Sequence, residues 1–130
     1  MLQCIVVTPE RTLCDQPADF VALMLFDGEI GIAPGHTPMI GRLGCGEMRI
    51  RCEDCTDRYY VEGGFVEVLG DVVSVLTHRA VPAGEIDEAV AQEQLLSAQS
   101  RKATTPEAAA VRDRAAEQSR AQLRVARRAR

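Results

Sequence analysis

The segment Phe65–Thr77, FVEVLGDVVSVLT, shows most directly how this chain folds. Valine recurs at alternate positions on both sides of Gly70-Asp71, so each flank has the pattern of a strand with one buried face. A glycine followed by an aspartate is one of the residue pairs that close a two-residue turn. The segment therefore predicts a β-hairpin.

Seven short segments before this hairpin also have strand character, and glycine or proline separates most of them. They are residues 2–8, 12–14, 19–26, 29–33, 39–43, 47–52 and 58–62. Many short strands with frequent turn residues are typical of an antiparallel β-sandwich or barrel.

The strand pattern ends at Pro82-Ala83-Gly84, which predicts a linker. Residues 85–130 then have a helical composition, and Thr105-Pro106 predicts the start of a second helix, with threonine as N-cap. We therefore expect an antiparallel helical hairpin over residues 85–130. It contains few large apolar side chains, so we expect it to be marginal alone and to dock loosely or move between partners.

The charge of the chain divides at the same point. Residues 1–84 carry six arginines and twelve acids, a net charge of −6, whereas residues 85–130 carry nine basic residues and seven acids, a net charge of +2. The longest apolar run, Val21–Phe26, is far shorter than the ~20 residues of a membrane helix. The first residues, Met1-Leu2-Gln3-Cys4, do not resemble a signal or transit peptide.

Four arginines of the second predicted helix, Arg120, Arg124, Arg127 and Arg128, fall within about 100° of its circumference. Such a row is a solvated helix end in one interpretation. In the interpretation that we favour, it is a docking face for acidic protein or phosphate groups. Binding to DNA or RNA is a weaker alternative because the rest of the chain is acidic.

The segment Asp27–Pro38, DGEIGIAPGHTP, resembles a signature of the epsilon subunit of F-type ATP synthases. Three further blocks are similar to that family in order and spacing. They are Thr8-Pro9-Glu10, Tyr60–Val68, and Val72–Thr77 followed by Ile86-Asp87-Glu88-Ala89.

The resemblance implies a β-plus-α fold: a flattened antiparallel β-sandwich of about ten strands (residues 1–84) and a C-terminal antiparallel helical hairpin (residues 85–130). It implies a non-catalytic subunit of the rotor's central stalk that couples rotation to ATP synthesis. The expected partners are the gamma subunit, the ring of c subunits and, through a mobile hairpin that inhibits ATP hydrolysis, the catalytic beta and alpha subunits. The expected place is the cytoplasmic face of a bacterial plasma membrane, reached only through other subunits.

Glu29 and His36 match family positions near the ring of c subunits. The alternatives are a plain turn residue for Glu29 and, for His36, a loop histidine bonded to backbone. Six further residues are expected to shape loops through their backbone preferences. They are Gly31, Pro34, Gly35, Pro38, Gly63 and Gly64.

Some bacterial members bind ATP at a motif that Ile86, Asp87 and Ala91 match, but Val90 stands where the motif has arginine. The loss of a guanidinium removes a charged phosphate contact, although Arg124 or Arg127 could compensate. We therefore expect weak or absent ATP binding and no cofactor.

The chain has five cysteines, of which Cys52 and Cys55 are expected to face each other across a hairpin turn. Inert thiols, a redox-sensitive pair and a metal site remain alternatives, and we favour inert thiols. No catalytic residue or metal site is expected. The rival function is a stand-alone β-sandwich binding module with an arginine-rich, nucleic-acid-binding helical tail.

Overall fold

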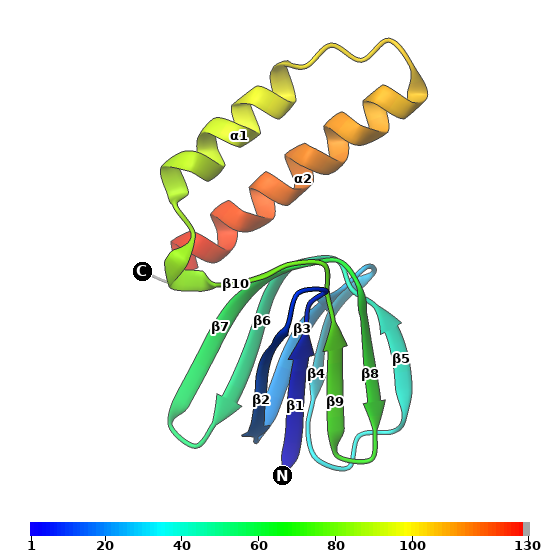
Figure 1. The fold of residues 1–130 in the computed structure, drawn as a ribbon, viewed down its shortest axis with the longest axis vertical. Helices are drawn as coiled ribbons and strands as arrows, with labels where there is room; N and C mark the ends of the chain where they lie inside the picture. Colours follow the sequence, from blue (N-terminus) through cyan, green and yellow to red (C-terminus); the bar gives the residue numbers. More distant parts are fainter. Residues whose placement is uncertain (129–130) are drawn as a thin grey trace.

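The computed structural model describes residues 1–128 and consists of a β-sandwich with a helical hairpin standing on one end of it (Figure 1). The strands are β1 (Leu2–Val7), β2 (Thr12–Ala18), β3 (Phe20–Leu25), β4 (Gly28–Ile32), β5 (Met39–Arg42), β6 (Cys45–Cys52), β7 (Cys55–Glu62), β8 (Phe65–Leu69), β9 (Val72–Leu76) and β10 (Ala80–Pro82). A 3₁₀ turn, η1 (Ala83–Glu85), leads into the helices α1 (Glu88–Ser100) and α2 (Pro106–Arg128).

The ten strands form two five-stranded sheets, in the orders β2-β1-β9-β8-β5 and β10-β7-β6-β3-β4. The predicted β8–β9 hairpin is confirmed, with Leu69 opposite Val72 and Gly70 in the turn at φ +60°. Its inward valines join a core that fills the space between the sheets. The buried members of that core are Leu2, Cys4, Val6, Ala18, Val21, Leu23, Ile32, Leu43, Met48, Ile50, Val61, Val66, Val68, Val73 and Val75.

The expected sandwich and hairpin are confirmed, but three details differ from the sequence pattern. One pair, β1 with β9, is parallel in a sheet that is otherwise antiparallel. Strand β2 continues to Ala18 through Pro17, which an edge strand tolerates because one side of its backbone has no partner strand. Strand β10 lies where a linker was predicted to begin, paired with Tyr59–Val61.

The second helix begins where Thr105-Pro106 predicts, and both helices have a side-chain N-cap. Asp87 caps α1, because its side chain accepts hydrogen bonds from the backbone N–H groups of Ala89 and Val90 at 3.0 and 3.3 Å. Thr105 caps α2 through a 3.1 Å bond from the N–H group of Ala108. Alanines such as Ala91, Ala98 and Ala116 are buried on the hairpin.

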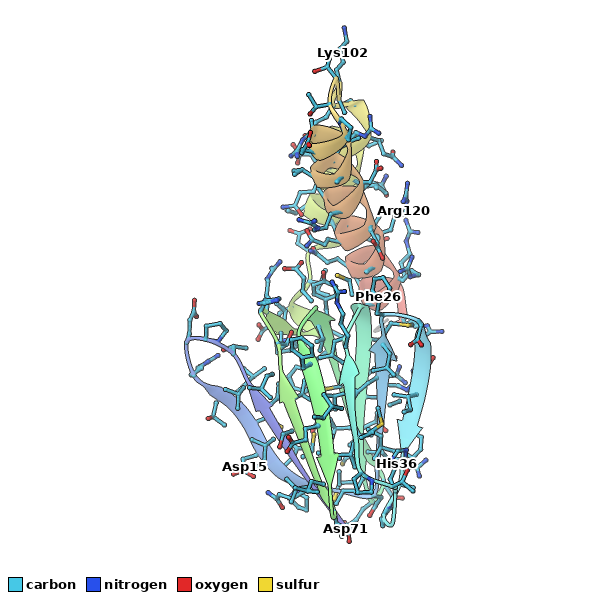
Figure 2. All side chains as sticks on the ribbon, turned by 90° about the vertical axis from the view of Figure 1, so that its right-hand side faces the viewer. Asp15, Phe26, His36, Asp71, Lys102 and Arg120 are labelled. Carbon is cyan, nitrogen blue, oxygen red and sulfur yellow. The ribbon has the colours of Figure 1, made fainter. Side chains whose placement is uncertain are left out.

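The hairpin meets the sandwich only near one end, and its tip at Lys102 is far from the sheets (Figure 2). A small second core forms at the junction from Tyr60, Ala83, Ala121 and Val125, with Cys45 and Ile86 packed against it. These residues come from three parts of the sequence that are far apart, β7, η1 and α2, so this junction depends on the whole fold. Within residues 1–128, none of the helices is sufficiently long and apolar to pass through a membrane.

Candidate functional site: the groove between sandwich and hairpin

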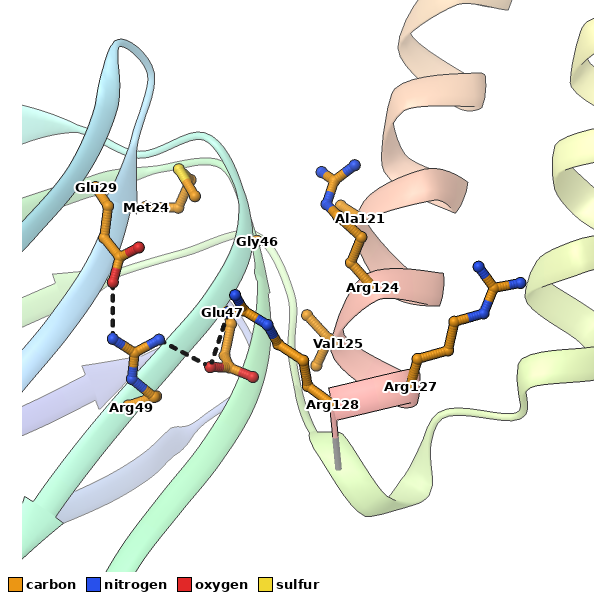
Figure 3. Close-up of a pocket in the computed structure, with 10 residues that line it drawn as sticks. All are labelled: Met24, Glu29, Gly46, Glu47, Arg49, Ala121, Arg124, Val125, Arg127 and Arg128. Carbon is orange, nitrogen blue, oxygen red and sulfur yellow. Dashed lines mark hydrogen bonds and ion pairs between the residues drawn. The ribbon is translucent and has the colours of Figure 1, made fainter. Parts of the chain in front are cut away.

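A groove of about 390 Å³ lies between the second sheet and the end of α2 (Figure 3). The sandwich contributes one wall and the last two turns of α2 contribute the other. The lining residues are Met24, Glu29, Gly46, Glu47, Arg49, Ala121, Arg124, Val125, Arg127 and Arg128. Four arginines and two glutamates give this groove a strongly charged lining.

The sandwich wall centres on the carboxylate of Glu47, whose side chain is only 5% exposed. Its Oε1 atom accepts hydrogen bonds from Arg49 at 3.0 Å and from Arg58 at 3.2 Å. Arg49 also donates to Glu29 at 2.7 Å. The hydrogen bond from Arg49 to Glu47, partly offset by burial, raises the pKa of the Arg49 guanidinium.

This cluster follows from the register of the β6–β7 hairpin. Cys52 lies directly opposite Cys55, which confirms the predicted turn, and the same register places Arg49 directly opposite Arg58. Like charges at opposite positions of paired strands repel each other, so such a pair needs an anion between the two side chains. Glu47, two residues before Arg49 on the same face, supplies it.

The four arginines of the row on α2, Arg120, Arg124, Arg127 and Arg128, are exposed, but they do not act at one place. Arg128, at one edge of the row, lies 3.7 Å from Glu47 Oε1, whereas Arg127, at the other edge, lies 3.0 Å from Glu88 Oε1 on α1. Arg124 lines the groove, and Arg120 lies beside a separate depression with Arg112 and Asp113. The row therefore borders both the sandwich and α1.

The second core beneath the groove is apolar except for two polar side chains. The hydroxyl of the buried Tyr60 donates to Glu62 at 2.8 Å, and burial followed by the neighbouring Glu62 raises the pKa of Tyr60. Burial also raises the pKa of the half-buried Cys45 thiol, with a further contribution from Glu62. Removal of α2 would uncover both side chains.

The residues that match the ATP motif have structural partners. Ile86 packs against the second core, Asp87 caps α1, and Ala91 is buried with 1% exposure. Val90, which occupies the motif's arginine position, is 46% exposed. Val90 takes part in the helix cap only through its backbone N–H group, and its side chain is not among the buried ones.

Glu29 and His36 lie at different ends of the sandwich. Glu29 belongs to the groove beside the hairpin, whereas His36 lies at the opposite end with Asp71 (Figure 2). A ring nitrogen of the half-buried His36 is 2.7 Å from the Thr37 carbonyl oxygen, so this histidine is bonded to backbone. At the same end, the N–H group of Gly35 donates to Asp71 at 3.1 Å and joins two loops.

The glycines and prolines expected to shape loops occupy different environments. Gly64, at φ +106°, lies so close to the Leu76 carbonyl that a Cβ atom would be 1.9 Å from its oxygen. Gly63 and Gly35 also have positive φ, and a Cβ on Gly31 would be 2.6 Å from the Phe20 ring. Pro34 and Pro38 are exposed in the loop between β4 and β5.

The five cysteines are free thiols, and Cys4 alone is fully buried in the sandwich core. Within the part of the chain that the structure describes, no three or more histidine, cysteine or acidic side chains gather in a way that could hold a metal ion.

Sequence reasoning missed Glu47, Arg49, Arg58 and Glu88 as site residues. A signal for the first three was present: once Cys52 and Cys55 flank a turn, the register sets Arg49 against Arg58, and a bridging acid must lie nearby. Glu88 had no such signal, because its contact with Arg127 depends on how the two helices cross.

Comparison with known proteins identifies the relatives of this chain. Residues 1–83 match the family model for the β-sandwich domain of the ATP synthase delta/epsilon chain. The ATP synthase epsilon chain of Rhodopirellula baltica is 48% identical over 97% of this chain and 98% of its own length. That of Carboxydothermus hydrogenoformans is 43% identical over 74% of this chain and 72% of its own.

Two solved structures share the fold. A chain of the Euglena gracilis mitochondrial ATP synthase (OSCP/F1/c-ring) superposes with a TM-score of 0.84, at 23% identity over 92% of this chain and 77% of that one. A chain from the central stalk and c-ring of the Tetrahymena thermophila enzyme superposes at 0.76, with 11% identity over 96% of both chains. No support emerges for a nucleic-acid-binding module. The chain therefore belongs to the ATP synthase epsilon chain family, the non-catalytic central-stalk subunits of ATP synthase.

Proposed function

We propose that this chain binds the gamma subunit through the outer face of the sheet β2-β1-β9-β8-β5. The observation that carries the proposal is a group of exposed apolar side chains on that face, on both sides of the Glu67–Ser74 pair. Phe65 lies opposite Leu76 and Leu69 opposite Val72, and their exposed fractions are 57, 52, 61 and 40%, respectively. Ile40 on the neighbouring β5 is 75% exposed. Several large apolar side chains exposed on one face mark a protein contact.

The opposite end from the hairpin is the proposed contact with the ring of c subunits. His36 and Asp71 lie there on loops that the Gly35–Asp71 hydrogen bond holds together. A ring that contacts this end does not reach Glu29 in the groove beside the hairpin, so we assign the ring contact to the loop containing His36. The chain would then lie on the cytoplasmic face of a bacterial plasma membrane and reach the membrane only through its partners.

The hairpin is the proposed regulatory domain, from residue 85 onward. Its junction with the sandwich is small, and three of its large apolar residues, Val90, Leu96 and Val111, are 46, 58 and 55% exposed. A weakly held element with unpaired apolar groups is suited to exchange between two docking positions. In the released position the hairpin would reach the alpha and beta subunits and inhibit ATP hydrolysis.

Reconstitution with gamma, alpha and beta subunits tests the function. Full-length chain and residues 1–84 should both copurify with gamma, and the assembly with residues 1–84 should hydrolyse ATP faster. Phe65→Ser together with Leu69→Ser should weaken gamma binding, whereas Phe26→Ser, which removes a 71% exposed phenylalanine from the β3–β4 turn, should not. Equal hydrolysis by the two assemblies would contradict the regulatory role.

Weak or absent ATP binding remains our expectation for the isolated chain. Asp87 already caps α1, and Val90 offers no charge to a phosphate group. Calorimetric titration with ATP should show no micromolar binding, and a micromolar site would contradict the expectation.

A further inference from the structure

We propose that Glu47 on the sandwich binds Arg128 of α2, and that this ion pair helps to hold the hairpin docked. We call the Glu47–Arg128 contact the latch. The inference rests on the proposed function in one respect, the mobility of the hairpin. It adds which side chains set the balance between the docked and released positions.

The apolar part of the junction is small. Ala121 and Val125 are the only side chains of α2 in the second core, and they pack on Tyr60 and Ala83 within the described residues. An alanine and a valine bury little apolar area, so their contribution to docking is modest. A polar contact at the same junction therefore has a large relative effect on the docking equilibrium.

Glu47 has an acceptor atom that the sandwich leaves unused. Oε1 accepts hydrogen bonds from Arg49 and Arg58, but Oε2 is buried and has no hydrogen-bond partner within residues 1–128. Buried polar atoms are nearly always bonded, so an unpaired carboxylate oxygen indicates a missing donor. Arg128 NH1 is 3.7 Å from Oε1, and a small approach would let its guanidinium span both oxygens.

Only one arginine of α2 can fill this role in the docked position. Figure 3 shows Arg128 directed towards Glu47, whereas the side chains of Arg124 and Arg127 point away from it. Arg127 is engaged with Glu88 on α1 at 3.0 Å. Arg124 lines the same groove and carries the same charge, and it is therefore the matched control.

The latch can open at little cost in free energy, because the charged side chains on the sandwich wall of the groove balance one another without the hairpin. Arg49 and Arg58 balance Glu29 and Glu47. When α2 leaves, Glu47 keeps two arginine partners, and no buried charge is left alone, which would be strongly unfavourable. Arg128, with 62% of its side chain exposed, returns readily to water. Such a contact biases an equilibrium between two positions and does not lock it.

A native thiol reports the position of the hairpin. Cys45 is half-buried against the second core beneath α2, so its alkylation rate rises with the fraction of released hairpin. Iodoacetamide labelling of the isolated full-length chain, followed by peptide mass spectrometry, gives this rate. We expect Arg128→Gln to raise the Cys45 rate about threefold, Glu47→Gln to do likewise, and the double variant to add nothing further. Arg124→Gln should leave the rate unchanged.

Cys4, buried in the sandwich core, is the internal control, because it reacts only if the sandwich itself opens. If Glu47→Gln also exposes Cys4, that change has opened the sandwich itself. The comparison of Arg128→Gln with Arg124→Gln then tests the latch, because both changes are on the exposed arc of α2. Equal rates for these two variants, or additive effects in the double variant, would overturn the latch. Labelling does not involve ATP hydrolysis, so a failed latch is distinguishable from a failed regulatory function.

Discussion

Gly64 shows how one residue fixes the join between β7 and β8. Its φ of +106° belongs to a region that side chains other than glycine rarely adopt. Opposite it, the hydroxyl of the buried Thr77 lies 2.7 Å from the Gly63 carbonyl and 3.1 Å from that of Arg79. The hydroxyl has one proton to donate, and the Arg79 carbonyl also accepts the N–H group of Glu62 at 3.0 Å. The chain thus passes from one sheet to the other with both carbonyl groups bonded and no room for a Cβ atom at Gly64.

Gly64→Ala should destabilise the chain by about 3 kcal/mol, because it adds backbone strain and a contact with the Leu76 carbonyl. Gly84→Ala is the matched control, since a Cβ there meets nothing within 4 Å. Urea unfolding of both variants measures the difference. Equal midpoints would contradict the close approach at Gly64.

Cys4 makes stability depend on alkaline pH. Burial raises the pKa of this thiol from 9.0 to about 12, with smaller contributions from Cys14 and Asp15. The folded chain therefore holds the proton longer than the unfolded chain. The resulting stability is complete below pH 9 and is lost as pH rises towards 12, at about 1 kcal/mol per pH unit.

Urea midpoints of reduced protein at pH 8, 9, 10 and 11 test this expectation. Cys4→Ala should reduce the loss of stability between pH 9 and 11, and the raised pKa values of the Cys14 and Cys45 thiols contribute to the loss that remains. Cys55→Ser, which changes an exposed thiol, should keep the slope of the original chain. Tyr60, whose pKa burial also raises, adds a further loss at the alkaline end in all three proteins. Identical slopes for Cys4→Ala and Cys55→Ser would refute the assignment.

At the scale of the element, the N-cap is a local source of stability for α1. The carboxylate of Asp87 accepts hydrogen bonds from two backbone N–H groups, while the side chains of Val90 and Leu96 on α1 remain exposed. Asp87→Ala should cost about 1 kcal/mol and reduce the helical circular dichroism signal. Asp87→Asn keeps an acceptor at the same place and should change stability little. Similar losses in the two variants would show that the charge, and not the cap, matters.

The strands and caps that could be predicted are those with local causes. Alternating valines and Gly70 set the β8–β9 hairpin, and Thr105-Pro106 sets the start of α2. Strand β10 could not be predicted, because three residues ending in proline have strand structure only through their pairing with Tyr59–Val61. The parallel pairing of β1 with β9 joins segments about 70 positions apart, which no local pattern encodes.

In the candidate site too, the features with a local cause could be predicted, and those set by tertiary packing could not. The arginine row of α2 follows from helical spacing alone, but its partners Glu47 and Glu88 lie on elements brought near it by tertiary packing. Glu29 and His36, seven positions apart in one motif, are separated because β4 runs away from the hairpin between them. Spacing along the chain therefore indicated the chemistry of the groove but not its location.

At the scale of the whole molecule, the division of charge matches the division of packing. The buried members of the main core all come from residues 2–75, and the net charge of residues 1–84 is −6. The hairpin, with a net charge of +2, buries mainly alanines between its helices. An acidic body with its own core and a basic hairpin without one should differ in their ability to fold alone.

Residues 1–84 should therefore unfold cooperatively as a separate fragment, with a modest loss of stability because Tyr60 and Cys45 lose their cover. Residues 85–130 should show little helix in isolation, since the helices keep their caps but lose the contact of Ala121 and Val125 with Tyr60. Circular dichroism of both fragments in the same buffer measures this. A stably helical hairpin fragment would show that the hairpin folds without the sandwich, and an unfolded sandwich fragment would show that the sandwich needs the hairpin; either result would contradict the prediction.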